Sequence, residues 1–393
     1  MPLGLYISVP FCKTKCSYCN FASDVFSRAV FKRYVDGLCS DIARASETAS
    51  QMNGHLERFV DSIYLGGGTP TLLEISQLER IFVTISQIFE IANEAEVTVE
   101  CAPGTLTDDV LKFFQRAGVN RVSLGVQSFV DKESSSVGRL HTRKIVDNDI
   151  NRLRQAGISD INVDLIAGLP HQTTESWQTS VQALIATGVP HASVYMLEID
   201  EDSRLGSELI AGGTRYHAHF VPNEDLTADF YESACEQLSA AGILQYEISN
   251  FARAGRQSRH NLKYWTRQPY MGFGVDAHSM LRSTSKESEA VRFANSDSLE
   301  RYVAGDAPTR VKVDFQSALE EEIFLGLRLN RGIKLKQLTI DHVATANADF
   351  AIAELIRENL LTRNGDLICL TARGRLLSND VFQRFISTPE AVS

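Results

Sequence analysis

Through Ala240, short apolar runs alternate with longer segments in which apolar residues recur at helical spacing. The short runs predict strands at 5–9, 60–65, 96–101, 121–126, 161–166 and 192–197. The longer segments predict helices at 30–45, 75–91, 108–117, 145–156, 176–186 and 226–240. Strands that alternate with helices indicate βαβ units and a parallel sheet. No dinucleotide-binding fingerprint accompanies the six units, so we expect an α/β fold, an incomplete (β/α)6 TIM-like barrel. Functional residues are expected on loops at the carboxyl ends of its strands.

The alternation breaks after this region. Residues 250–267 carry five basic side chains and no acidic one, and a stretch of glycine and aromatic residues follows at 270–274. Residues 282–289 are polar and rich in serine, which predicts a surface loop. The basic side chains are Arg253, Arg256, Arg259, Lys263 and Arg267.

A new helical pattern begins near Gln316. It predicts helices at 316–329, 348–359 and 371–385, with a hairpin at 360–370 around Asn364-Gly365. Helices that flank a small hairpin resemble a winged-helix module. The expected organisation is a partial barrel over 1–220, an extension that covers the barrel over 221–310, and a C-terminal helical, winged-helix-like domain over 311–393.

Composition indicates a soluble globular protein and argues against a membrane-spanning or nucleic-acid-binding one. The 393 residues are 44% apolar and 22% charged, as in a soluble globular protein. The chain has no apolar run long enough for a spanning helix and no recognisable leader segment, so we expect a cytoplasmic protein without an integral membrane segment. Peripheral contact with a membrane stays open. The net charge of −10 argues against a nucleic-acid partner.

Three cysteines, Cys12, Cys16 and Cys19, lie in one polar loop directly after the first predicted strand. A structural zinc site would lack a fourth ligand, because the loop contains no histidine. A disulfide framework would not suit a reducing compartment. Three thiolates fit a [4Fe–4S] cluster in which one iron keeps an open coordination position. The other four cysteines are expected to be small buried residues.

Glycines and polar residues follow other strands of the predicted barrel. Gly66-Gly67-Gly68-Thr69-Pro70 is either a tight turn or a place where backbone amides grip a charged ligand. Glu100 and Gln127 end the third and fourth strands, Arg139 lies beyond the fourth, and Asp164 lies in the fifth. Each acid could be a satisfied structural group, but together these residues would surround one pocket.

These motifs together resemble a known superfamily. The spacing Cys12-x3-Cys16-x2-Cys19 with Tyr18, followed by the glycine motif at 66–70, resembles the radical S-adenosylmethionine (SAM) superfamily. Within it, the chain is similar to the oxygen-independent coproporphyrinogen III oxidase family over nearly its whole length. The motifs that carry this resemblance are residues 6–12, 124–129, 138–141 and 164–170.

The resemblance implies cofactors and their ligands. The three cysteines would bind three irons of the cluster, and the amino and carboxylate groups of SAM would bind the fourth. Gly67, Gly68 and Thr69 would contact the methionine part of SAM. The other positions that match SAM-site residues of the family are Tyr6, Glu100, Gln127, Arg139 and Asp164. Arginine for a carboxylate, and acids for an ammonium group or ribose hydroxyls, suit those roles chemically.

Two departures separate the chain from the oxidases of that family. The oxidases carry a further cysteine two residues after the third, where this chain has Phe21. They also have an N-terminal extension before the cluster loop. Both departures resemble the HemW branch, whose members are regarded as heme chaperones. The His-Asn-x-x-Tyr-Trp motif of that branch is similar to residues 260–265 of this chain.

The chemistry of residues 250–267 suggests a heme site. His260 is a candidate axial ligand, and Tyr264 and Trp265 could stack on the macrocycle, while the basic residues could pair with propionates. A solvated basic loop with Trp265 anchored in the core is the structural alternative, and a platform for single-stranded nucleic acid is a weaker one.

The resulting hypothesis is a heme chaperone that binds heme and a SAM-coordinated [4Fe–4S] cluster and transfers heme to acceptor hemoproteins. The alternatives are an oxygen-independent coproporphyrinogen III oxidase and another radical SAM enzyme, so whether the chain is an enzyme stays open. No residue is assigned a catalytic role. An electron donor such as a flavodoxin or a ferredoxin is an expected partner.

Overall fold

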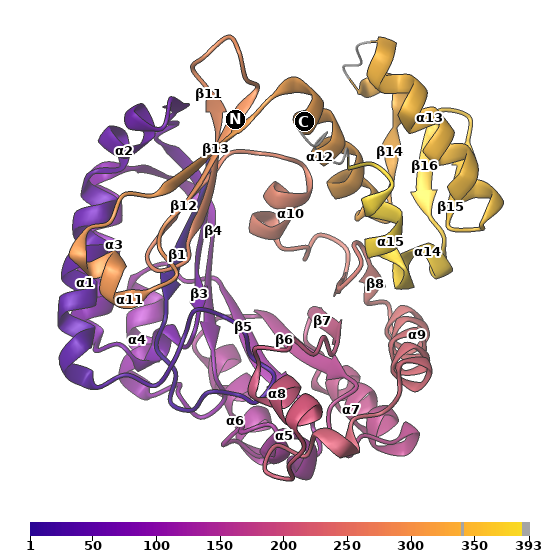
Figure 1. Cartoon of the computed structure of the whole chain (residues 1–393). Coiled ribbons are helices and arrows are strands. Elements are labelled where there is room, and N and C mark those ends of the chain that lie inside the picture. Colours follow the sequence, from indigo (N-terminus) through magenta and orange to yellow (C-terminus); the bar gives the residue numbers. More distant parts are fainter. Residues whose placement is uncertain (339–341, 387–393) are drawn as a thin grey trace.

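The computed structural model describes residues 1–338 and 342–386, and it confirms the α/β class with an incomplete barrel (Figure 1). The six predicted strands pair side by side and in parallel. They are β1 (Leu3–Val9), β3 (Phe59–Gly67), β4 (Glu90–Cys101), β5 (Arg121–Gln127), β6 (Asp160–Ala167) and β7 (His191–Met196).

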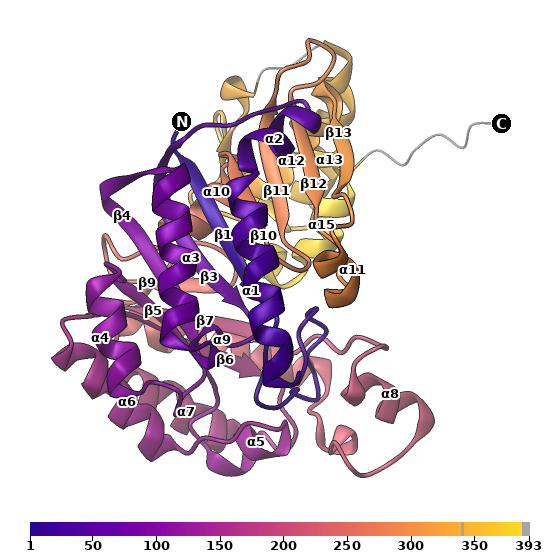
Figure 2. The same cartoon turned by 90° about the vertical axis from the view of Figure 1, so that its left-hand side faces the viewer.

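Helices cover the outer face of this curved sheet (Figure 2). The larger ones are α1 (Arg28–Ala43), α3 (Ile75–Ile88), α4 (Asp108–Arg116), α6 (Arg143–Gln155), α7 (Thr174–Thr187) and α9 (Glu224–Ala240). The shorter ones are α2 (Ala45–Gln51), α5 (Asp131–Ser136) and α11 (Leu299–Ala304), while α8 (Arg204–Ala211) lies apart from this layer (Figure 2). Side chains of these helices and of the strands form one large apolar core, in which Trp177, Tyr34 and Phe114 are fully buried. This burial is the main source of stability for the layered arrangement.

The sheet extends beyond the six strands at both edges. On one side β1 pairs in parallel with β10 (Tyr270–Phe273), which continues through β11 (His278–Ser283), β12 (Ala290–Ala294) and β13 (Thr309–Val313) in antiparallel order. On the other side β7 pairs with β9 (Asn250–Ala252), which pairs with β8 (Leu244–Gln245). A short strand, β2 (Gly54–His55), pairs with β11. Because the path of described strands ends at β13 and β8, the sheet does not close.

The strand β10 is absent from the sequence prediction, which treated 270–274 only as a glycine and aromatic stretch. All four of its residues are buried. A Cβ atom at Gly272 would collide with the backbone of His278, so close strand packing accounts for that glycine. The hydrophobic pattern of four residues was too short to identify a strand.

Three predicted helices have wrong bounds. The helix expected at 348–359 begins at His342 and ends at Arg357. The helix expected at 75–91 ends at Ile88, and β4 starts at Glu90, earlier than predicted. The last expected helix, 371–385, is instead two short helices, α14 (Ala372–Leu376) and α15 (Ser378–Gln383). Residues 250–267 contain helix α10 (Arg259–Trp265), which lies on the concave side of the sheet (Figure 1).

The C-terminal elements form a helical unit with a small sheet, as expected for a winged helix. They are α12 (Phe315–Leu327), β14 (Ile333–Lys334), α13 (His342–Arg357), β15 (Leu361–Asn364) and β16 (Leu367–Leu370), with α14 and α15. Strand β16 lies between β14 and β15. The unit has its own apolar cluster, which includes Leu327, Leu355 and Ile368. It lies across the open side of the curved sheet (Figure 1). In the two described ranges, no helix is long and apolar enough to cross a bilayer.

Candidate functional site

A cavity of about 690 Å³ lies between the carboxyl ends of the parallel strands and the C-terminal unit. Most of the residues predicted for the cluster and SAM line it. They are Cys12, Cys16, Cys19, Gly67, Gly68, Thr69, Glu100, Gln127, Arg139 and Asp164. Parallel strands bring these residues together because their carboxyl ends meet at one edge of the sheet.

The cysteine loop is anchored by contacts to the surrounding backbone. Lys15 Nζ donates to the carbonyls of Phe21 (2.7 Å) and Ser23 (2.5 Å). Thr14 Oγ1 donates to the carbonyl of Gly138 at 2.9 Å. The Phe21 ring, at the position where the oxidases have cysteine, is 65% exposed. These contacts keep the loop at the edge of the cavity.

The three thiols lie close enough to influence one another. Burial raises the pKa of the Cys12 thiol, a hydrogen bond with Ser23 lowers it, and the neighbouring Cys19 and Cys16 raise it further. As they stand, the described residues contain no group of three or more His, Cys, Asp or Glu side chains drawn close enough to hold a metal ion. Each thiolate of a [4Fe–4S] cluster binds a different iron, so the three sulfurs need not converge on one ion to hold a cluster.

The glycine loop after β3 is packed against the strand that leads into the cysteine loop. The amide of Gly68 donates to the carbonyl of Val9 at 2.8 Å, and that of Thr69 to the carbonyl of Phe11 at 2.7 Å. A Cβ atom at Gly68 would lie 2.6 Å from the Phe11 oxygen, and Gly67 has a φ of +101°. Close backbone packing therefore accounts for Gly68 and the positive φ accounts for Gly67, while both still line the cavity.

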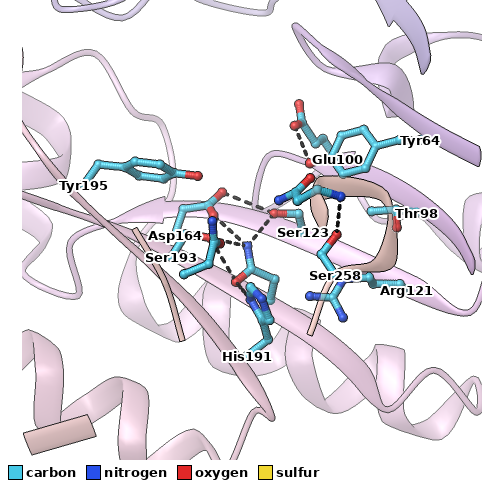
Figure 3. Close-up of a pocket in the computed structure, with 13 residues that line it drawn as sticks. Tyr64, Thr98, Glu100, Arg121, Ser123, Asp164, His191, Ser193, Tyr195 and Ser258 are labelled. Carbon is cyan, nitrogen blue, oxygen red and sulfur yellow. Dashed lines mark hydrogen bonds between the residues drawn. The ribbon is translucent and has the colours of Figure 1, made fainter. Parts of the chain in front are cut away.

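Glu100 and Asp164 are carboxylates in the cavity wall, and Figure 3 shows them on neighbouring sides of a polar pocket. Tyr64 Oη donates to Glu100 Oε1 at 2.7 Å, and the Gly67 amide donates to Oε2 at 3.1 Å. Burial raises the pKa of Glu100 to about 7, and the nearby charge of Asp164 adds to this effect. Burial also raises the pKa of Asp164. Without a ligand, burial thus favours the neutral form of both carboxyl groups. A cationic ligand in the cavity would lower their pKa values and favour the charged form.

A smaller polar pocket of about 50 Å³ continues behind these acids (Figure 3). The amide of Asn162 donates to Asp164 Oδ1 (2.7 Å), to Ser123 Oγ (2.8 Å) and to Ser193 Oγ (3.0 Å). His191 Nδ1 lies 2.6 Å from Asn162 Oδ1. This volume has room for water but not for a cofactor. Sequence reasoning missed Asn162, although its spacing of two from Asp164 places both on one face of β6.

Gln127 and Arg139 have polar atoms without a partner among the described residues. Gln127 Oε1 and Arg139 Nε are both buried and unpaired. Arg139 Nη2 donates to Tyr18 Oη at 3.3 Å, which ties it to the cysteine loop. Gln127 also has a φ of +69°, an uncommon conformation for a residue with a side chain. Orphaned buried atoms at a strained strand end indicate a ligand site.

Tyr6 does not line the cavity but lies just behind it. Its ring stacks on Tyr64, with centroids 6.1 Å apart, and its hydroxyl would lie 3.5 Å from a Cβ atom at Gly67. Burial raises its pKa above the usual range. In this structure Tyr6 supports the glycine loop.

The predicted heme residues also lie away from the cavity lining. The His260 ring is fully buried, with Nδ1 3.0 Å from Ser62 Oγ and Nε2 2.8 Å from Tyr264 Oη. Burial lowers the pKa of His260 to about 3. The Arg328 guanidinium lies over the Trp265 ring, 4.2 Å from its centroid. The assignment of His260, Tyr264 and Trp265 to heme stays a prediction, and in this structure neither nitrogen of His260 is free for iron.

Several basic side chains of residues 250–267 have acidic partners from elsewhere in the fold. Lys263 Nζ lies 2.7 Å from Asp61, and Arg267 lies 2.8 Å from Glu289 and 3.0 Å from Glu321. The segment looked free of counter-charges because these acids are distant in the sequence. Its two most buried cations are therefore already paired.

Comparison with known families identifies the class. The Radical SAM superfamily matches residues 6–184, and the HemN C-terminal domain matches residues 314–377. The solved structure of coproporphyrinogen III oxidase (HemN) from Escherichia coli has the same fold, with a TM-score of 0.81 and 23% identity over 98% of this chain and 90% of that one. The open α/β sheet and these matches define a radical SAM protein with a HemN-type C-terminal domain.

Full-length relatives narrow the family. Heme chaperone HemW of Lactococcus lactis is 32% identical over 98% of this chain and 97% of its own length. Heme chaperone HemW of Bacillus subtilis is 33% identical, over 97% of this chain and 98% of its own. The chain belongs to the HemW family.

Proposed function

We propose that this protein is a heme chaperone that holds a SAM-coordinated [4Fe–4S] cluster, binds heme and transfers it to acceptor hemoproteins. Membership of the HemW family supports this function, because full-length relatives carry the name heme chaperone. The exposed Phe21, where the oxidases have cysteine, supports the chaperone over the oxidase.

The cavity residues suit these cofactors. Cys12, Cys16 and Cys19 would bind three irons, and such a cluster supplies an electron that can cleave the sulfonium of SAM. Similarity to the full-length relatives carries the proposed chaperone function, and the observation that supports SAM in this cavity is the pair of buried unpaired atoms, Gln127 Oε1 and Arg139 Nε, in the wall next to these thiols. Arg139 would pair with the SAM carboxylate, and Glu100 and Asp164 would take its ammonium group or ribose hydroxyls. Gly67, Gly68 and Thr69 would contact its methionine part, with Tyr6 supporting them.

The test is a paired assay on anaerobically purified protein with a reconstituted cluster. We expect the protein to retain hemin through gel filtration and to pass it to an apo-hemoprotein, followed by the absorbance of the acceptor. We expect no turnover of coproporphyrinogen III when SAM and reduced flavodoxin or ferredoxin are supplied. Formation of protoporphyrinogen at a sustained rate would contradict the chaperone and favour the oxidase.

A further inference from the structure

The large cavity has a second wall that the cluster and SAM residues do not form. This wall consists of apolar and aromatic side chains from the ends of β6 and β7, from α9 and from the C-terminal unit. Its main members are Ile166, Tyr195, Met196, Leu197, Tyr231 and Leu376. The apolar wall adjoins the polar one at Asp164 and Ile166, which are two residues apart on β6.

Tyr195 shows that this wall faces an enclosed space. Its side chain is 41% exposed, yet removal from bulk water raises its pKa above the usual range. Asp164 also raises it, so the ring lies near the carboxylate of the polar wall. Its exposed surface therefore faces the cavity, where a flat apolar ligand could cover it.

Arg375 of α14 also lines the cavity. Its Nη1 donates to the carbonyl of Leu370 at 3.2 Å, and among the described residues it forms no ion pair with a carboxylate. Burial raises the pKa of Cys235 to about 11, while the Tyr231 hydroxyl and the Arg375 charge lower it. Arg375 is thus a cation beside the apolar wall with donors to spare.

Arg328, another arginine that lines the cavity near the apolar wall, already has an acidic partner. Its Nε lies 2.7 Å from the fully buried Glu247, and its guanidinium covers Trp265. Arg328 therefore lies between the cavity and Trp265 of α10. Trp265 packs against a lining residue and does not line the cavity itself.

We propose that the apolar wall is the binding site for the tetrapyrrole, with the macrocycle against Tyr195 and one propionate paired with Arg375. The inference rests on the proposed heme-binding function and names its site. Heme combines a flat apolar ring with two carboxylates, which matches an apolar wall bordered by an unpaired guanidinium. Heme and SAM then share one cavity, and the C-terminal unit supplies a direct contact to heme.

The test compares Arg375→Gln and Arg375→Lys with wild type by titration with zinc protoporphyrin, followed by its fluorescence. The matched control is Arg373→Gln, an exposed arginine of the same helix that does not line the cavity. We expect Arg375→Gln to weaken binding by about tenfold or more, because a hydrogen-bonded charge pair is lost. Arg375→Lys should recover part of the loss, and Arg373→Gln should bind as wild type.

Repeating the titration with the dimethyl ester of the same porphyrin identifies the interacting group. Wild type should bind the ester about tenfold more weakly, whereas Arg375→Gln should no longer distinguish ester from acid. Iron content and SAM binding must remain at wild-type levels in the variant, which excludes misfolding. Unchanged affinity in Arg375→Gln would overturn this site, as would equal discrimination against the ester. If wild type bound no porphyrin at all, the proposed function would fail instead.

Discussion

The strand-end site and helix α10 were both predicted to bind a cofactor, but their polar groups are satisfied to different degrees. At the strand ends, Gln127 Oε1 and Arg139 Nε are buried beside a large cavity without a protein partner. In α10, both ring nitrogens of His260 are within hydrogen-bond distance of hydroxyl groups, and Lys263 is paired with Asp61.

The two regions differ in the free energy that a ligand would gain by forming hydrogen bonds there. An unpaired buried donor or acceptor raises the free energy of the empty site, so a ligand that pairs with it binds favourably without rearrangement. A ligand at His260 would first have to break contacts to Ser62 and Tyr264. The strand ends are therefore prepared for a ligand beside the cavity, whereas His260 and Lys263 of α10 already have partners. In α10, Trp265 Nε1 is a buried donor without a hydrogen-bond partner among the described residues, and Trp265 does not line the cavity.

The largest expected effect concerns the cysteine loop. Replacing Cys12, Cys16 or Cys19 by alanine should abolish most of the iron bound after anaerobic reconstitution, because each thiolate would hold one iron. Iron and sulfide analysis of the purified variants measures this. The control is Cys369→Ala in the C-terminal unit, which should keep its iron. Full iron content in all three variants would remove the cluster from this loop.

Arg139→Gln should weaken SAM binding by about 10- to 100-fold, since a charge-assisted hydrogen bond contributes about 1.5–3 kcal/mol. Anaerobic calorimetry on the reconstituted protein measures the affinity. Arg143→Gln, an exposed arginine of α6 at 3.9 Å from Asp147, is the matched control and should bind as wild type. Wild-type affinity in Arg139→Gln would show that the unpaired Nε has no role in binding SAM.

His260→Ala should lower the free energy of unfolding by about 2–4 kcal/mol, because it leaves a cavity and removes the partner of two hydroxyl groups. Tyr264→Phe, which removes one of these hydroxyls, should cost about 1 kcal/mol. Denaturant unfolding of the apoprotein measures both. SAM binding should not change in either variant. Normal stability in His260→Ala together with lost heme binding would instead identify His260 as a ligand in an opened conformation.

The last prediction concerns the pH dependence that Glu100 gives to stability. The pKa of Glu100 is about 7 in the folded protein and 4.5 in the reference state, so the folded form holds the extra proton between these values. Stability is therefore lost as pH rises from 4.5 to 7, and Glu100→Gln should remove that loss. The stability of the apo variant relative to wild type should rise by on the order of 1–3 kcal/mol between pH 4.5 and pH 8. A pH-independent difference would show that folding does not raise the pKa of Glu100.

Much of the fold could be predicted because its signals are local. The alternation of apolar runs with helical periodicity predicted six parallel strands, each of which the structure contains. The strands β10 to β13 were missed because runs of four to six residues carry little periodicity. For β10, a glycine within the run and a pairing partner distant in the sequence, β1, added to the difficulty. The division of the chain at residues 220 and 310 stays a prediction.

The sequence predicted the individual cluster and SAM residues of the candidate site, but it did not predict the apolar wall of the cavity. Motifs pointed to Cys12, Gly68 and Gln127, because each is a recognisable residue type at a strand end. The apolar wall with Tyr195 and Arg375 carries no motif, and its members come from separate elements. Such a surface exists only after the C-terminal unit has packed across the sheet.

The sequence by itself determined the order of the six parallel strands and their helices, the cysteine loop, the glycine turn and the polar strand ends, because each depends on residues that are neighbours in the chain. Only the tertiary structure decided which polar groups were left for a ligand. His260 and Lys263 find their partners in β3, and the Nε of Arg139 finds none among the described residues. Pairing across the fold depends on three-dimensional distance, and the free energy of an unpaired buried group becomes visible only when all its neighbours are in place.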